Sequence, residues 1–225
     1  ENEMNNTIKT LMAAAMLTAS AVGVVAADKP ATIKAVGTWG SLTNYQKHEG
    51  PFWNEQITEA SGGTIIGDIK PQTELGLKGF EIMRLVKNGV FDFAFGLPGY
   101  VAAENAIFEG GDLSSVTQDI DTQRKVADAY YPILEKAFAE TYNAKLMTLY
   151  PFPSQTLWCN GEVKGLADLE GKKIRVYSTT LGDFVEGVGG TSVTVPFAEV
   201  IPALEKGVVD CGITGTMSAY KAKWH

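Results

Sequence analysis

The sequence has very few of the residues that most often build metal sites and nucleophilic catalytic sites. Its 225 residues include only two histidines and two cysteines, and the cysteines lie far apart in the chain. Neither a G-x-S-x-G elbow nor an H-E-x-x-H motif is present, and the acidic residues at 119 and 121 lack the glycine and distal glutamate of a calcium loop. The sequence therefore predicts no metal site and no cofactor, and it offers no catalytic constellation.

Positive charge is also scarce. Lysine and arginine total 19 against 26 aspartates and glutamates, which gives a formal charge of -7. Nucleic acids and anionic membranes attract clustered basic residues, and the chain has no basic run, so both are excluded as expected partners. An apolar content of 45% and a charged content of 20% are ordinary for a soluble protein of one or two domains.

Only one long apolar run occurs, at residues 11–25, and it is shorter than the roughly 20 residues that a membrane-spanning helix needs. Lys9 precedes it, and the small residues Val25-Ala26-Ala27 follow the pattern that a signal peptidase reads. We therefore predict a signal peptide over residues 1–27 with cleavage before Asp28, and export of the chain to the periplasm.

The two cysteines suit an exported protein, because disulfides persist in oxidising compartments. Cys159 lies in TLWCN and Cys211 in VVDCGI, two segments that we expect to be strands of one lobe. They either form a disulfide or pack as two buried thiols, and the sequence leaves both alternatives open.

The most informative stretch, residues 166–215, reads as alternating strands and helices. The expected strands are residues 173–177, 191–195 and 208–213, and the expected helices are residues 181–188 and 197–204. Glycines and Pro196 end most of these segments. Such alternation predicts a parallel sheet, whose loops meet at the carboxyl ends of the strands, where small ligands bind.

Arg175 lies in the first of these strands, between the apolar residues Ile174 and Val176. A surface salt bridge is the ordinary interpretation of a single arginine. In an apolar strand, however, the planar guanidinium is better suited to bind a carboxylate through two parallel hydrogen bonds. We expect that carboxylate to come from a ligand.

GKKIRV, followed about twenty residues later by VPFAEVIPALEKGVVDCGITG, resembles the substrate-binding subunits of tripartite ATP-independent periplasmic (TRAP) transporters. The resemblance covers nearly the whole mature chain. It implies a two-lobe α/β periplasmic binding protein fold (type II-like), in which each lobe is a mixed β-sheet flanked by helices and a hinge and central cleft separate the lobes. In that family, the arginine that matches Arg175 binds the substrate carboxylate.

The first half of the chain repeats the same alternation. Strands are expected at residues 31–36, 64–70, 91–97 and 144–150, and helices at residues 44–60, 80–88 and 119–143. Pro51 is expected in the first turn of a helix or at a kink, and Pro151-Phe152-Pro153 where the chain crosses between lobes. We accordingly assign residues 28–153 to the first lobe and residues 154–225 to the second.

The resemblance also implies further site residues. It places Thr38 or Trp39 at the cleft, together with Leu97 and Tyr100. It also matches Phe197 to an aromatic that packs on the substrate, and Thr214 to a polar position. Gln155 stands where many relatives have a second arginine. The aromatic candidates are, by default, core residues. Gln155 favours a monocarboxylate, such as a 2-oxo or 2-hydroxy acid, over a dicarboxylate or sialic acid.

The resemblance implies a monomeric receptor that delivers a small organic carboxylate to TRAP membrane subunits, which use an ion gradient. One alternative is the binding protein of an ATP-driven importer. Another is a periplasmic enzyme that uses Glu199 or Asp210 with Arg175, although Glu199 also suits the first turn of a helix. A last helix, with Tyr220 and Trp224, ends without a stop signal, so we expect a C-terminally truncated chain and an incomplete second lobe.

Overall fold

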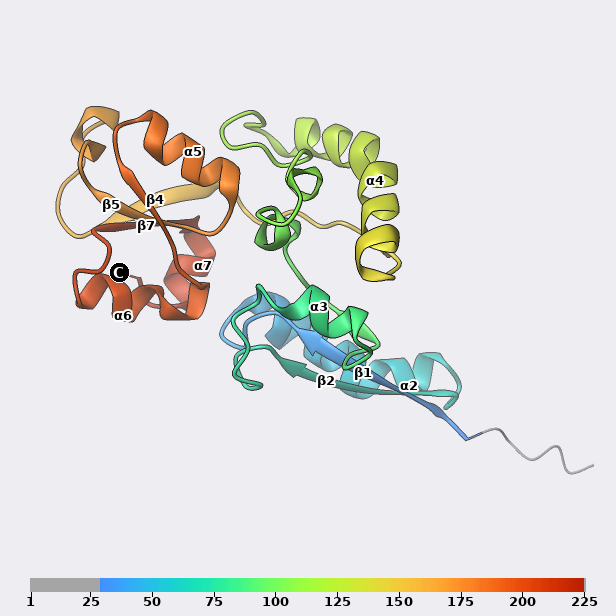
Figure 1. The fold of residues 1–225 in the computed structure, drawn as a ribbon. Helices are drawn as coiled ribbons and strands as arrows, with labels where there is room; N and C mark the ends of the chain where they lie inside the picture. The colour runs from blue at the N-terminus through green and yellow to red at the C-terminus, as the bar shows by residue number, and fades with distance from the viewer. Residues whose placement is uncertain (1–28, 225) are drawn as a thin grey trace, which may run out of the picture.

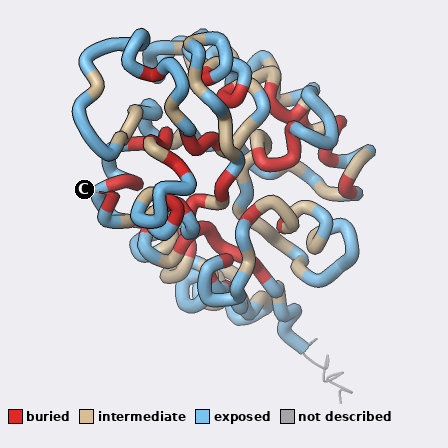
Figure 2. The backbone as a smooth tube through the Cα atoms, turned by 60° about the vertical axis from the view of Figure 1, so that its left-hand side comes forward, coloured by how far each residue is buried: buried red, intermediate tan, exposed pale blue. Residues whose placement is uncertain are grey.

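The computed structural model describes residues 29–224, which form two separate β-sheets with helices around them (Figure 1). The predicted signal peptide, residues 1–27, and its cleavage site before Asp28 lie outside the described residues. Across residues 29–224, none of the helices is both long enough and apolar enough to cross a membrane. Buried segments gather in the interior of the molecule, and exposed ones follow its outer loops and helix surfaces (Figure 2).

The first sheet has the strand order β2-β1-β3, and both neighbours run parallel to β1. Its strands are β1 (Ala31–Gly37), β2 (Ile65–Pro71) and β3 (Phe93–Ala94). The central strand β1 becomes fully buried towards its carboxyl end. Within the expected strand at residues 91–97, only β3 forms. Gly96 and Pro98 follow β3, and proline has no N–H to donate to a sheet.

A helix between β1 and β2 forms at the expected place but with unusually wide turns. It consists of η1 (Asn44–Glu49), η2 (Phe52–Gln56) and α2 (Ile57–Ala60), of which the first two are π-helical. Pro51 lies between the two π-helical segments. The alternative that places it in the first turn of a helix is therefore wrong. Proline has no N–H to donate within a helix, and the N–H of Gly50 bonds to the carbonyl of Tyr45, five residues back.

The second sheet contains the strands predicted from residues 166–215. The order is β4-β7-β5-β6, in which β5 runs parallel to both of its neighbours and β4 runs antiparallel to β7. The strands are β4 (Gln155–Cys159), β5 (Lys173–Val176), β6 (Thr191–Thr194) and β7 (Cys211–Gly215). Around them lie α5 (Thr179–Gly187), η6 (Phe197–Glu199), α6 (Val200–Glu205) and α7 (Thr216–Lys221). The predicted parallel sheet is therefore confirmed, and the carboxyl ends of β5 and β7 lie at the same edge.

The long helix α4 (Ile120–Tyr142) also forms as predicted. The carboxylate of Asp119 accepts the N–H of Thr122 at 2.8 Å and caps the first turn. At the other end Asn143 takes the left-handed conformation, with φ of 51°. The buried face of α4 packs on η3 (Pro98–Val101) and η4 (Ala106–Phe108).

Residues 144–150, which connect α4 to the second sheet, do not form the predicted strand. A strand needs a neighbour to hydrogen-bond with, and the described residues place none beside this segment. Side-chain contacts hold it instead: the hydroxyl of Tyr131 donates to the carbonyl of Leu146 at 2.6 Å. The division into lobes at residues 153 and 154 stays a prediction.

One hydrophobic cluster joins the two sheet regions. Trp39 and Tyr100 from the first region pack with Phe197, Val200 and Trp224 from the second. Separate clusters lie inside the second sheet region and under α4. The two sheet regions therefore share buried surface in this structure, and they meet through aromatic side chains.

Cys159 and Cys211 form a disulfide, which decides between the two alternatives left open by the sequence. The two residues lie directly opposite each other on β4 and β7. Because β4 is an edge strand paired only with β7, the bond fixes this edge of the sheet covalently.

Replacing both cysteines by alanine should lower the free energy of unfolding by about 2–4 kcal/mol, because the unfolded chain loses a cross-link between residues 52 positions apart. Guanidinium unfolding of the parent and of C159A/C211A measures the difference. A reducing agent should destabilise the parent by a similar amount and leave the double variant unchanged. An equal response of both proteins to the reducing agent would contradict the prediction.

Candidate functional site

The guanidinium of Arg175 is buried at the centre of the second sheet region, with the residue 1% exposed. Its Nε donates to the carbonyl of Val195 at 2.8 Å, and its Nη1 donates to the carbonyl of Ile213 at 2.8 Å. Val195 follows β6 and Ile213 lies on β7, the two strands that flank β5. The side chain is therefore held in one orientation by the backbone of both neighbours.

No carboxylate of residues 29–224 forms an ion pair with Arg175. The guanidinium instead lies 5.2 Å from the ring centre of Tyr177 and 5.8 Å from that of Trp224, and it hydrogen-bonds the side chain of Tyr100. Burial lowers the pKa of Arg175, but an arginine remains charged at neutral pH. The result is a buried cation without a matching anion, not the surface salt bridge of the ordinary interpretation.

All six predicted site residues line the same cleft, whose volume is about 980 Å³. They are Trp39, Tyr100, Gln155, Arg175, Phe197 and Thr214. The cleft also extends along α4 and across apolar side chains of the second sheet region. Its volume lies at the upper end of the range for small-molecule sites, so only the part around Arg175 needs to contact a small acid.

The three aromatic candidates form a wall of this cleft and belong to the core at the same time. The ring centres of Trp39 and Phe197 are 5.2 Å apart, and those of Trp39 and Tyr100 are 6.1 Å apart, in edge-on arrangements. Each of the three residues is less than a tenth exposed. The three rings are thus core residues that also line the cleft, and Tyr100 hydrogen-bonds the side chain of Arg175.

Gln155 and Thr214 both lie near the end of the β4–β7 pair, where Gln155 pairs with Gly215 and Thr214 with Thr156. Gln155 is exposed, and its Nε2 donates to the carbonyl of Pro153 at 2.8 Å. Thr214 is buried, and its backbone carbonyl accepts hydrogen bonds from Thr156 and Trp158. Gln155 therefore presents a neutral amide at the place where a second arginine would add a charge.

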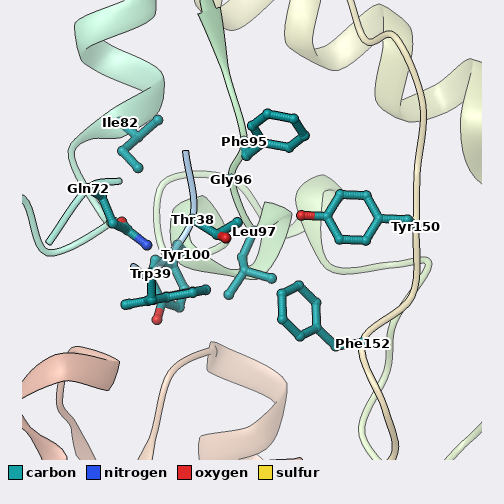
Figure 3. Close-up of a pocket in the computed structure, with 11 residues that line it drawn as sticks. Thr38, Trp39, Gln72, Ile82, Phe95, Gly96, Leu97, Tyr100, Tyr150 and Phe152 are labelled. Atoms are coloured by element: carbon teal, nitrogen blue, oxygen red, sulfur yellow. The ribbon is translucent and has the colours of Figure 1, made fainter. Parts of the chain in front are cut away.

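The other candidates Thr38 and Leu97 border a second, internal cavity of about 10 Å³ (Figure 3). It also lies between Gln72, Ile82 and Tyr150, while Trp39 and Tyr100 lie at its side nearest the second sheet region. A space of this size matches a single water and excludes an organic acid. Trp39, Leu97 and Tyr100 border both the internal cavity and the cleft.

Sequence reasoning missed the role of Glu49. Although it follows His48 in a predicted helix, Glu49 is not a surface residue, because it is 5% exposed. Its carboxylate accepts the N–H of Thr38 at 2.7 Å and the hydroxyl of Thr38 at 2.9 Å, so it fixes the turn that carries Trp39. The wide turns of η1 rotate Glu49 towards β1, which a regular helical period does not predict.

Glu109 is a second buried carboxylate that the sequence did not single out. It is 4% exposed, and its oxygens accept the N–H of Thr180 at 3.1 Å and the hydroxyl of Thr180 at 2.9 Å. Thr180 lies in the first turn of α5, where a helix attracts negative charge. Because Glu109 precedes α4 and Thr180 follows β5, these bonds connect the two halves of the chain beside the cleft.

Comparison with known proteins places these residues in one family. The family model for bacterial extracellular solute-binding proteins, family 7, matches residues 36–225. The match thus includes the second sheet, the first sheet from the end of β1 onward, the aromatic wall and Arg175.

Solved structures with the same fold agree. DctP7 of Bordetella pertussis, an extracytoplasmic solute receptor that binds pyroglutamic acid, has a TM-score of 0.77 at 22% identity, over 86% of this chain and 63% of its own. A marine metagenome TRAP protein specific for pyroglutamate has a TM-score of 0.78 at 23% identity, over 87% and 63%. A TRAP protein of Sulfurospirillum deleyianum with bound succinate has a TM-score of 0.74 at 23% identity, over 86% and 62%.

The chain thus spans less than two thirds of the length of these receptors. Their likeness confirms the predicted fold class, a two-lobe α/β binding protein with helices around its sheets. The second sheet is mixed as predicted, whereas the described strands of the first sheet all run parallel.

Stability should depend on pH through Glu49. Burial raises the pKa of its carboxyl above the ordinary value of 4.5, so the folded state binds this proton more tightly than the unfolded state. Relative to Glu49→Gln, the parent should be most stable below that value and should lose stability as the pH rises through the raised pKa. Urea unfolding from acid to neutral pH measures this difference. Glu59→Gln, at an exposed position of α2, is the control, and the same pH profile for both variants would refute the prediction.

Proposed function

The chain belongs to family 7 of the bacterial extracellular solute-binding proteins, and on this premise we propose that it is a periplasmic receptor for a small organic acid whose carboxylate pairs with Arg175. The receptor passes its ligand to the membrane subunits of a TRAP transporter. It binds and releases the acid without changing it chemically. In this proposal the chain reaches the periplasm through its signal peptide and acts as a monomer.

One observation carries the proposal, namely the buried and uncompensated charge of Arg175. Two backbone carbonyls orient the guanidinium, and neither of them carries the negative charge that would neutralise it. A buried ion without a partner costs several kcal/mol. A ligand carboxylate offsets that cost and gains a bidentate hydrogen bond in surroundings that exclude water.

The aromatic wall gives the site a means of closing. Trp39 and Tyr100 approach Phe197 and Arg175 from the opposite side of the cleft. Movement about residues 151–153 would separate these groups and let the acid enter, and closure would remove water from its carboxylate. Phe197 and Thr214 then contact the ligand from the same side as Arg175.

The solutes of the structural relatives support the ligand class. DctP7 binds pyroglutamic acid, and the Sulfurospirillum deleyianum protein holds succinate, and both solutes are small organic acids. In this chain the amide of Gln155 adds no second positive charge to the site. A monocarboxylate, such as a 2-oxo or 2-hydroxy acid, therefore suits the cleft better than a dicarboxylate.

The enzyme alternative has less support, because both of its candidate carboxylates are engaged elsewhere. Glu199 pairs with Lys78 at 2.6 Å, and Asp210 accepts the backbone N–H of Lys173 at 2.8 Å. Neither forms an ion pair with Arg175. The importer alternative keeps the same fold and site, and it differs only in the membrane partner.

Removing the guanidinium tests the proposal. Arg175→Ala should weaken binding of an organic acid by about 2–5 kcal/mol, or roughly 30-fold or more in Kd, because the carboxylate would be buried without a partner. A thermal-shift screen of organic acids finds the ligand through its stabilisation of the folded state, and calorimetry gives the Kd. Arg175→Lys should also bind poorly, because a point charge cannot replace the planar fork.

Arg84→Ala is the matched control, because Arg84 is exposed and lies outside the cleft. Its affinity should equal that of the parent. An acid that stabilises the parent and Arg175→Ala equally would make Arg175 a structural residue and remove the proposed site. Circular dichroism of both Arg175 variants separates loss of binding from loss of folding.

Adding a positive charge should shift the ligand preference. Gln155→Arg should raise the affinity for succinate by roughly tenfold relative to lactate, because a charge-assisted hydrogen bond would meet the second carboxylate. Gln56→Arg makes the same change of charge at an exposed position outside the cleft and should leave the preference unchanged. An unchanged preference in Gln155→Arg would place Gln155 outside the ligand site.

A further inference from the structure

The cleft contains a negative side chain as well as a positive one. Asp112 lines the same cleft as Arg175 and Tyr177, and it is an exposed residue. It lies at the end of a turn in which its N–H donates to the carbonyl of Glu109 at 2.9 Å. No motif in the sequence marks this residue, since it lies in an irregular segment between η4 and α4.

Contacts on both sides of Asp112 fix its turn beside the end of β5. Glu109 holds the first turn of α5 through Thr180, and the hydroxyl of Ser114 lies 3.4 Å from that of Thr180. Gly99 also approaches Ser178 closely, since a Cβ built on Gly99 would lie 3.2 Å from the Ser178 Cβ. Because the loop at residues 177–180 follows β5 directly, these contacts place Asp112 close to the strand that carries Arg175.

Tyr177 packs against Arg175 and lines the cleft together with Asp112. Its ring centre is 5.2 Å from the guanidinium carbon of Arg175. Burial raises the pKa of the Tyr177 hydroxyl, and the negative charge of Asp112 raises it further, whereas the charge of Arg175 lowers it. Both charges therefore act on the Tyr177 hydroxyl, and all three residues line the same cleft.

The carboxylate of Asp112 has unused capacity to accept hydrogen bonds. Among the hydrogen bonds and ion pairs of residues 29–224, none involves its carboxylate oxygens, although Glu109 next to it is fully engaged with Thr180. The surrounding protein and the charge of Glu109 both raise the pKa of Asp112. A carboxylate in such surroundings gains more from a hydrogen-bond donor than one in open water does.

We propose that Asp112 is a specificity residue, which selects organic acids that carry a hydroxyl, amine or amide N–H near the carboxylate bound by Arg175. The inference rests on the proposed function of the same cleft. With the ligand carboxylate on Arg175, a donor on the neighbouring carbon points across Tyr177 to Asp112. A second carboxylate at that place meets repulsion from Asp112 and Glu109 instead, so dicarboxylates are disfavoured by charge and not by size.

The test compares acids that differ only in the donor. Lactate, 2-hydroxybutanoate and mandelate are each measured beside propanoate, butanoate and phenylacetate, with succinate as the dicarboxylate. The parent should bind at least one hydroxy acid about 10- to 100-fold more tightly than its partner, because a hydrogen bond to a charged group has that effect. In Asp112→Asn this ratio should fall to less than about threefold, and binding of succinate should improve.

Asp68→Asn is the matched control, since Asp68 is an exposed residue of β2 outside the cleft and undergoes the same change of charge. Its ratio should equal that of the parent, and equal thermal midpoints show that Asp112→Asn is folded. A ratio that Asp112→Asn leaves unchanged, or a parent that binds both members of each pair equally, overturns this inference while the role of Arg175 stands. Absence of binding to any acid in the parent, or unaltered binding in Arg175→Ala, overturns both.

Discussion

The burial of one guanidinium governs this structure. Arg175 lies in the middle of a parallel strand, where desolvation of its charge opposes folding by several kcal/mol. The fold compensates in part with the carbonyls of Val195 and Ile213 and with two aromatic faces. These groups orient the charge without neutralising it. The second sheet thus keeps a buried positive charge without a negative partner near the carboxyl ends of its strands. A ligand that binds there can supply the negative charge.

The surroundings of Arg175 are built by both sheet regions. From the first region Tyr100 hydrogen-bonds the guanidinium and Trp39 packs against Phe197, and Glu109 binds the first turn of α5. Each contact joins residues that are far apart in the chain, so the surroundings of Arg175 depend on both regions meeting. A ligand that pairs with Arg175 and touches the aromatic wall contacts both regions, and its binding favours the closed arrangement over the open one.

The sequence allowed most of the fold and the centre of the site to be predicted, for identifiable reasons. Residues 173–215 have regular periodicity with glycine and proline at the ends, and the local signals agree with the final fold. The strand at residues 144–150 was wrong because a strand depends on a partner that local pattern does not reveal. Glu49 and Asp112 were missed because a π-helix and an irregular turn determine where they point, and neither follows a period.

The arrangement of charges explains how a cleft of this size can still be selective. Most of its lining is apolar and would accept many solutes of suitable volume. In the proposed receptor, selection depends on three groups that line the cleft: Arg175 binds an anion, Tyr177 packs beside it, and Asp112 accepts a hydrogen bond from a donor on the ligand. A buried donor or acceptor left unpaired costs more than a paired one gains, so these groups discriminate mainly by rejecting acids with the wrong neighbour to the carboxylate.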